Sequence, residues 1–152
     1  MYTFRRAYND DGKEILELVS TVLNSYGLTV SKDSTDSDLS NLEENYFTRH
    51  GWFEVIEHDN RIIGSFGIYP VNSNTCELRK MYLHPQHQGN GLGKVMMETA
   101  LEKARELGYS EMILETNSRL KKANELYTGF GFQFYTPKEL SHRCDLALRL
   151  EL

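Results

Sequence analysis

The fold of this chain is indicated first by the loop Gln88-Gly89-Asn90-Gly91-Leu92-Gly93, which follows the apolar run Met81-Tyr82-Leu83. After the loop, apolar residues recur at helical spacing from Leu92 to Leu107, and Gly108 is placed to end that helix. Three glycines leave successive backbone N–H groups uncovered at a helix N-terminus, where the helix dipole also favours an anion. The stretch therefore predicts a strand, an anion-binding loop and a long helix.

The segments around this unit predict a mixed sheet. Trp52–His58, Arg61–Val71 and Thr75–Leu83 form an antiparallel meander by pattern, and Asp59-Asn60 is a two-residue hairpin turn. Ser110–Thr116 is a strand after the long helix, and a strand–helix–strand unit normally pairs its two strands in parallel. We therefore expect Thr75–Leu83 and Ser110–Thr116 to be parallel.

The remaining segments complete an α+β fold. We expect helices on both sides of a central mixed, mostly antiparallel sheet, and one domain spanning residues 1–152. The additional predicted elements are the strand Tyr2–Arg6, a helix from Asn9 or Asp10 to Gly27, the helices Asp38–Arg49 and Leu120–Thr128, and the strands Phe132–Tyr135 and Arg143–Leu150.

Composition argues against several classes of protein. A net charge of −5 has the wrong sign for a protein that neutralises nucleic-acid phosphates. No apolar run is long enough to suggest a membrane span, and the N-terminus lacks the apolar core of a signal peptide, so we expect a cytoplasmic protein. Cys76 and Cys144 lie far apart in apolar segments and are expected to be buried, reduced thiols. The five histidines show no metal-ligand spacing, so no metal is expected.

The glycine spacing excludes two common phosphate-binding loops. A dinucleotide fingerprint that begins at Gly89 needs a third glycine where the chain has Lys94. An ATP-binding loop that ends at Gly93-Lys94 needs glycine at Gln88 and Ser or Thr at Val95. A different anionic ligand is therefore indicated.

The spacing Gln-x-x-Gly-x-Gly, met from Gln88 to Gly93, is accompanied by a second motif further along the chain. This is Ala123-Asn124-Glu125-Leu126-Tyr127, followed by Gly129-Phe130-Gly131-Phe132. With both motifs the sequence resembles the GCN5-related N-acetyltransferase (GNAT) superfamily, most strongly from about Glu77 to Phe132. The resemblance implies transfer of an acetyl group from acetyl-CoA to a primary amine of a small molecule or peptide, by direct attack in a ternary complex.

The resemblance also implies the residues that hold acetyl-CoA. Backbone groups of Met81 and Leu83 would pair with the pantetheine arm, and the glycine-rich loop would hold the pyrophosphate. The implied contacts of the loop, the arm and the sulfur are Gln88, Gly89, Asn90, Gly91, Gly93, Lys94, Asn117, Asn124 and Tyr127.

Two side chains are candidates for proton transfer. A lysine-like amine is uncharged in only about one in 2,500 molecules at pH 7, so a base must take its proton. The resemblance places Glu77 in that role, and the alternative is an ion pair with Arg79 on the same strand face. A phenol can donate a proton to the departing thiolate, which assigns Tyr127, and the alternative is a core aromatic of an amphipathic helix.

Other polar residues have simpler interpretations. We expect Asp33–Asp38 to be a solvated loop, although it precedes a helix that borders the acceptor pocket in this superfamily. Asp145 could bind a cationic amine, but an ion pair with Arg143 or Arg149 is favoured. The acceptor is not specified by any motif. A non-catalytic acyl-CoA sensor and a subunit of a larger complex remain alternatives, and the sequence also allows a homodimer through the C-terminal strands.

Overall fold

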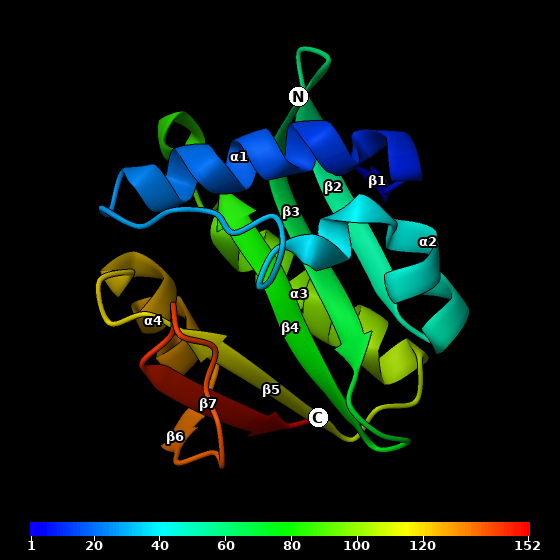
Figure 1. Ribbon diagram of the computed structural model, residues 1–152, viewed down its shortest axis with the longest axis vertical. Helices are drawn as coiled ribbons and strands as arrows, with labels where there is room; N and C mark the ends of the chain where they lie inside the picture. The colour runs from blue at the N-terminus through cyan, green and yellow to red at the C-terminus, as the bar shows by residue number, and fades with distance from the viewer.

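The computed structural model describes residues 1–152, and its centre is one seven-stranded sheet in the order β1-β2-β3-β4-β5-β7-β6 (Figure 1). The strands are β1 (Thr3–Arg6), β2 (Trp52–His58), β3 (Arg61–Pro70), β4 (Thr75–Leu83), β5 (Glu111–Thr116), β6 (Gln133–Tyr135) and β7 (Leu146–Glu151). The α-helices are α1 (Gly12–Asn24), α2 (Leu42–Asn45), α3 (Leu92–Glu106) and α4 (Lys121–Gly129). This order confirms the predicted fold.

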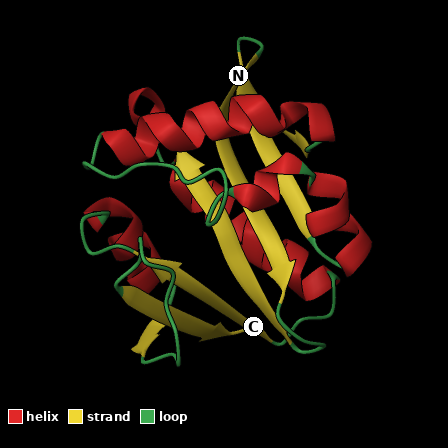
Figure 2. Ribbon diagram, in the orientation of Figure 1, coloured by secondary structure: helices red, strands yellow, loops and turns green.

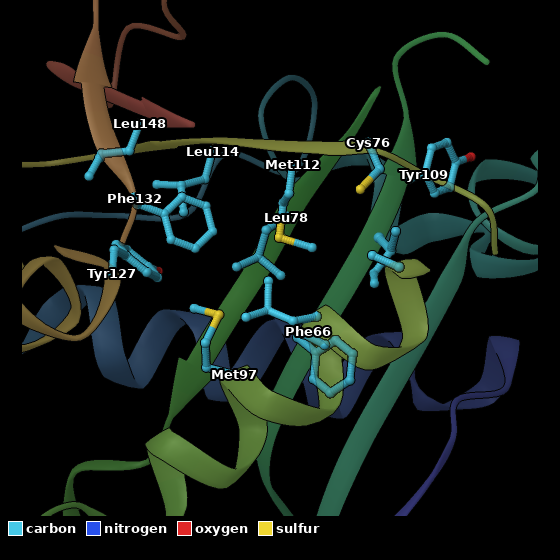
Figure 3. Packing of buried hydrophobic residues seen from close by; sticks show 14 residues of the cluster. Phe66, Cys76, Leu78, Met97, Tyr109, Met112, Leu114, Tyr127, Phe132 and Leu148 are labelled. Carbon is cyan, nitrogen blue, oxygen red and sulfur yellow. The ribbon is translucent and has the colours of Figure 1, made fainter. Parts of the chain in front are cut away.

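Helices cover both faces of the sheet. Helices α1 and α2 lie over the strands β1 to β4 on one face, and α3 lies behind the same strands (Figure 1). Helix α4 lies beside β5 and β7, where Tyr127 packs with Phe132 and Leu148 (Figure 3). Burial of these apolar faces is the main force that holds the layers together. None of the helices is both long and apolar enough to cross a membrane.

The meander from β2 to β4 is antiparallel, as predicted. Asp59 and Asn60 have φ values of +51° and +62°, the left-handed conformation that a two-residue hairpin turn of type I′ requires. Strand β4 contains a bulge, because Ser65 pairs with Tyr82 while Gly67 pairs with Arg79. Lys80 has a φ of +55° in this bulge, an uncommon conformation for a residue with a side chain.

The bulge determines which side chains of β4 point to each face. Tyr82 packs against the cluster under α1, whereas Met81 and Leu83 pack against the cluster that contains Met96 of α3. Without the additional residue, strand alternation would reverse the faces of everything beyond Arg79.

Strands β4 and β5 are parallel, as the strand–helix–strand unit predicts, but they pair only from Thr75 to Glu77 and from Glu111 to Ile113. Beyond these residues the two strands diverge, and Figure 2 shows the opening between them. The sheet therefore splits into two parts, β1 to β4 and β5 to β7, that share one end.

The prediction of one continuous helix over Asp38–Arg49 is wrong. The chain forms a 3-10 turn at Ser37–Ser40, the short helix α2, and a second 3-10 turn at Phe47–Arg49. Asn41 interrupts the helix, because its backbone is extended and its side chain accepts the Glu44 N–H as an N-cap. The apolar spacing that indicated a helix instead places Leu39, Leu42 and Tyr46 in the core.

Candidate functional site

A cleft of about 770 Å³ lies where β4 and β5 diverge. Its walls come from α1, the loop that follows α1, β4, the glycine-rich loop, β5, α4 and the segment before β7. The lining includes Tyr26, Thr35, Glu77, Arg79, Lys80, Met81, Tyr82, Leu83, Gln88, Gly89, Gly93, Glu115, Thr116, Asn117, Leu126, Tyr127, Glu139, Arg143 and Cys144. Segments far apart in the sequence therefore meet at the split in the sheet.

The edge of β4 that faces this cleft carries free backbone groups. His84 donates its N–H to Ile63 on β3, and successive residues of a strand direct their backbone groups to opposite edges. The N–H and C=O groups of Met81 and Leu83 are therefore directed to the open edge. The Leu83 carbonyl accepts a hydrogen bond from the Gln88 Nε2 at 2.9 Å. The other backbone groups of this edge remain available to an extended ligand.

The glycine-rich loop presents a cradle of backbone amides. Gly89 and Gly91 have φ values of +86° and +85°, and a Cβ added at either position would meet no atom within 4 Å. Such open space allows a ligand to approach the backbone directly. The backbone N–H groups that donate to no protein acceptor are those of Gly89, Asn90, Gly91, Gly93 and Lys94. The amides and the N-terminus of α3 fit a pyrophosphate.

The loop is anchored to the N-terminal segment of the chain. The Tyr2 hydroxyl lies 3.0 Å from His87 Nδ1 and accepts the Asn90 Nδ2 at 3.2 Å. The rings of His58 and His84 lie close to His87. Burial lowers the pKa of His87, and repulsion from these two histidines lowers it as well. Lys94 is exposed on the first turn of α3 and makes no ion pair within the chain.

Tyr127 reaches the cleft from α4. Its side chain is only 5% exposed and packs edge-on against Phe132, yet its hydroxyl has no hydrogen-bond partner in the chain (Figure 3). The only fully buried side-chain polar atom without a hydrogen bond is Asp38 Oδ1, so the Tyr127 oxygen keeps access to the cleft that it lines. Burial raises the pKa of Tyr127 well above its usual value, so the phenol stays protonated at neutral pH. It can donate a proton or a hydrogen bond into the cleft.

Glu77 lies at the base of the opening and is paired with Arg79. The Arg79 Nε donates to Glu77 Oε1 at 2.5 Å, and the guanidinium stacks 3.7 Å above the Tyr69 ring. Both side chains also line the cleft. The ion pair that we considered as the alternative for Glu77 is therefore present, while the carboxylate remains at the site where a base would act.

The prediction that Asp33–Asp38 is a solvated loop is wrong for its last residues. The Asp36 side chain has no exposed surface; it accepts Arg143 at 2.6 and 2.9 Å and lies 3.3 Å from Lys80 Nζ. Asp38 lies 3.1 Å from the same lysine and accepts the Tyr46 hydroxyl. Burial alone would raise the pKa of Asp36, but hydrogen bonds from Arg143 and the Ser31 amide hold it below its usual value. Basic residues distant in sequence made this burial possible.

The predicted ion pair of Asp145 is also wrong. Its carboxylate accepts the Ser118 N–H at 2.8 Å and the Ser118 hydroxyl at 2.7 Å, while Arg143 is bound to Asp36 and Arg149 lies over the Tyr135 ring. Asp145 therefore stabilises the turn after β5. A carboxylate close to unpaired backbone N–H groups commonly takes this role.

Asn117 belongs to the same turn, and Asn124 on α4 is hydrogen-bonded to it. Asn117 lines the cleft, and its Nδ2 donates to the Arg143 carbonyl at 2.8 Å. Asn124 donates to the Asn117 carbonyl and accepts from the Thr116 hydroxyl, both at 3.0 Å, so its amide is used within the protein. Asn124 lies behind the cleft wall, and its expected contact with a ligand stays a prediction.

A model of the acetyltransferase (GNAT) family matches residues 16–132 of this chain. The chain belongs to the GNAT acetyltransferase family. The uncharacterized N-acetyltransferase YjgM of Escherichia coli is 38% identical over 135 residues, which cover 85% of this chain and 80% of YjgM. N-acetyltransferase 8F1 of Rattus norvegicus is 32% identical over 102 residues, 64% of this chain but only 46% of the rat protein.

Solved structures show the same fold as this GNAT protein. An acetyltransferase of the GNAT family from Staphylococcus aureus superposes with a TM-score of 0.88 at 19% identity, covering 99% of both chains. The Salmonella typhimurium protein yncA, described with its cofactor acetyl-CoA, superposes with a TM-score of 0.72 at 21% identity, covering 99% of this chain and 94% of yncA. At these identities the likeness concerns the fold.

The split sheet brings most of the sequence-derived residues of this acetyltransferase to one cleft. Glu77 and Tyr127 both line it, with Met81, Leu83, Gln88, Gly89, Gly93 and Asn117. Asn90, Gly91 and Lys94 lie on the adjoining loop and helix. Sequence reasoning missed Lys80, Arg143 and Cys144, which also line the cleft, because their position depends on the bulge and on tertiary contacts. No group of three or more His, Cys, Asp or Glu is arranged to hold a metal ion.

Proposed function

We propose that this GNAT protein transfers an acetyl group from acetyl-CoA to a primary amine of a small molecule or peptide, by direct attack in a ternary complex. The observation that supports this most is the pairing of a free β4 edge with a cradle of unbonded amides at the head of α3. The two features adjoin each other in one cleft, where the Leu83 carbonyl accepts the Gln88 Nε2 at 2.9 Å, so an extended ligand with a pyrophosphate can use both.

The proposed cofactor contacts follow from this geometry. Backbone groups of Met81 and Leu83 would hold the pantetheine arm, and Gln88, Gly89, Asn90, Gly91, Gly93 and Lys94 would hold the pyrophosphate. Asn117 and Asn124 are proposed to order the wall beside the arm. When bound, acetyl-CoA supplies a thioester, whose carbonyl carbon accepts a neutral amine.

Two side chains would move the protons. Glu77 takes a proton from the protonated amine, directly or through a water molecule, which leaves the nitrogen lone pair free to attack. The Arg79 Nε donates to the Glu77 carboxylate at 2.5 Å and holds it in place. Tyr127 donates its proton, or a hydrogen bond, to the sulfur that leaves, and its raised pKa keeps that proton available.

A panel of amines tests this function. The protein is incubated with acetyl-CoA and diamines, amino acids, aminosugars or peptides, and the release of free thiol is followed. We expect release with at least one class of amine and none without acceptor. Binding of acetyl-CoA without thiol release in every arm would favour a sensor or a subunit of a larger complex instead.

Two further features of the protein are proposed with the function. Both cysteines are free thiols, which agrees with a reducing compartment such as the cytoplasm. Strand β6 is one of the two edge strands of the sheet, so a homodimer through the C-terminal strands is proposed as well. Light scattering at several protein concentrations measures that assembly, and a monomer at all of them would contradict it.

A further inference from the structure

Cys144 is a free thiol at the open end of β5, and it lines the cleft together with Tyr82, Thr116 and Tyr127. The backbone on both sides of it is fixed. The N–H of Asp145 donates to the Thr116 carbonyl at 3.1 Å, and the Arg143 carbonyl accepts the Asn117 Nδ2 at 2.8 Å. The thiol is therefore held against the cleft by the same contacts that shape its wall.

A second observation indicates that the cleft lined by this thiol takes a ligand. Tyr127 is only 5% exposed, and its hydroxyl reaches the cleft without any hydrogen-bond partner in the chain. A buried hydroxyl without a hydrogen bond costs free energy unless a ligand or water satisfies it. Cys144, Tyr127 and Tyr82 all line this one cleft.

We propose that Cys144 is a modification site that forms a reversible mixed disulfide with coenzyme A when coenzyme A disulfide enters the cleft. The proposal rests on the proposed function, which puts the cofactor sulfur beside Tyr127. The Cys144 thiol loses its proton to water, and the thiolate attacks one sulfur of coenzyme A disulfide. The old S–S bond breaks, a new S–S bond forms, and one coenzyme A leaves as a thiolate that takes up a proton.

Binding in the cleft compensates for a weakly acidic thiol. Burial raises the pKa of Cys144, so the thiolate is scarce at neutral pH and an untethered disulfide should react slowly. A disulfide held by its phosphates is present at a high effective concentration, which accelerates the exchange. The bound coenzyme A then fills the cleft and excludes acetyl-CoA. Reduction by a thiol reverses the modification.

Cys76 provides the matched control within the same chain. It is a residue of β4 in the hydrophobic core and has no exposed surface, and burial raises its pKa to about 12. Coenzyme A disulfide cannot reach it in the folded protein. The comparison of Cys144→Ser with Cys76→Ser therefore separates a cleft reaction from a general reaction of protein thiols.

The experiment measures intact mass after incubation of the folded protein with coenzyme A disulfide. We expect one added coenzyme A per chain in the wild type and in Cys76→Ser, none in Cys144→Ser, and full reversal by dithiothreitol. Below the pKa of the thiol the rate should rise about tenfold per pH unit. Glutathione disulfide at the same concentration should react at least about tenfold more slowly, because it lacks the groups that the loop binds.

The melting temperature of each variant is first measured with coenzyme A. This measurement distinguishes failure of the proposed function from failure of the Cys144 inference alone. If coenzyme A gives no rise, the proposed function and this inference both fail. If coenzyme A raises the melting temperature but no adduct forms, or the adduct is on Cys76, only the inference is overturned. Equal rates with glutathione disulfide would also overturn it, since the thiol would then be a general one.

Discussion

Tyr127 carries the acid half of the proposed reaction, and its hydroxyl can be removed without changing the ring. In Tyr127→Phe we expect turnover to fall by roughly 10²–10⁴-fold, at the small end because a thiolate with a pKa near 8.5 already leaves readily. Affinity for acetyl-CoA should change little. Steady-state turnover and calorimetry on one preparation measure both quantities.

Tyr109→Phe is the matched control for that prediction. The Tyr109 hydroxyl donates to the His50 carbonyl at 2.7 Å, far from the cleft lining, so its loss should cost about 1 kcal/mol of stability and leave turnover intact. If Tyr127→Phe behaves like Tyr109→Phe, with full activity in a less stable protein, the acid role of Tyr127 is wrong.

The role of Glu77 as a base can be tested through the pH dependence of kcat/KM in Glu77→Gln. The fraction of neutral amine rises from about one in 2,500 at pH 7 to roughly one in ten near pH 9.5, so the need for a base declines. Glu77→Gln should therefore lose about 10²-fold in kcat/KM for the amine at pH 7, and the deficit should shrink as the pH rises.

Glu111→Gln is the control on the same sheet face, because Glu111 binds Thr75 and does not line the cleft. It should keep wild-type kcat/KM at all pH values. A deficit of Glu77→Gln that stays constant from pH 7 to 9.5 would show that Glu77 acts only through its ion pair with Arg79.

At the scale of elements, the glycine-rich loop depends on backbone approach. Gly91→Val adds side-chain atoms where a ligand would lie, and we expect affinity for acetyl-CoA to fall about tenfold or more while the circular dichroism spectrum is retained. The φ of +85° also adds strain. Titration calorimetry measures the loss.

Gly108→Val controls for that strain. Gly108 has a φ of +93°, and its added Cβ would also meet open space, but it lies at the other end of α3. This variant should lose similar stability and keep its affinity for acetyl-CoA. Equal affinity losses in the two variants would place the phosphates elsewhere.

The buried ion pairs of Asp36 connect the loop after α1 to β4 and to the segment before β7. Asp36→Asn leaves Arg143 without its bidentate partner, and we expect a loss of about 3–5 kcal/mol in the free energy of unfolding at pH 7. The folded pKa of Asp36 is lowered, so its contribution is full well above pH 3.8 and declines as the pH falls through the folded value.

Chemical denaturation of Asp36→Asn and the wild type at pH 7 and below pH 3.8 measures this contribution, and the difference between the two proteins should shrink in acid. Glu43→Gln breaks the exposed pair with Arg6 and should cost less than about 1 kcal/mol. Equal losses in the two variants at pH 7 would mean that the Asp36 cluster adds nothing beyond a surface ion pair.

For the whole molecule, the sequence was most informative where interactions between residues close in the sequence determine the structure. Asp59-Asn60 predicts its turn because few residues adopt two left-handed conformations, and the spacing from Leu92 to Gly108 predicts α3 because burial enforces helical periodicity. The parallel pairing of β4 with β5 follows because the helix between them returns the chain to the end of the sheet where β4 began.

Long-range contacts explain most of what could not be predicted. The bulge at Lys80 has a positive φ, but no glycine marks that position in the sequence. The bulge decides which side chains of β4 enter the cleft. Asp36 looks like a loop residue until Arg143, 107 positions away, is placed beside it. Asn41 interrupts a helix that apolar spacing alone would continue. At Lys80 and Asp36 a tertiary partner outweighs the local pattern, whereas Asn41 acts through a local hydrogen bond to the Glu44 N–H.

The most direct test of the account is the melting temperature of the protein with acetyl-CoA, coenzyme A or NAD. A ligand at 100 times its Kd stabilises the folded state by about 2.7 kcal/mol, which corresponds to a rise of about 5–10 °C for a chain of this size. We expect that rise with acetyl-CoA and with coenzyme A, and none with NAD. A rise with NAD alone, or with none of the three ligands, would contradict the proposal that this cleft binds acetyl-CoA.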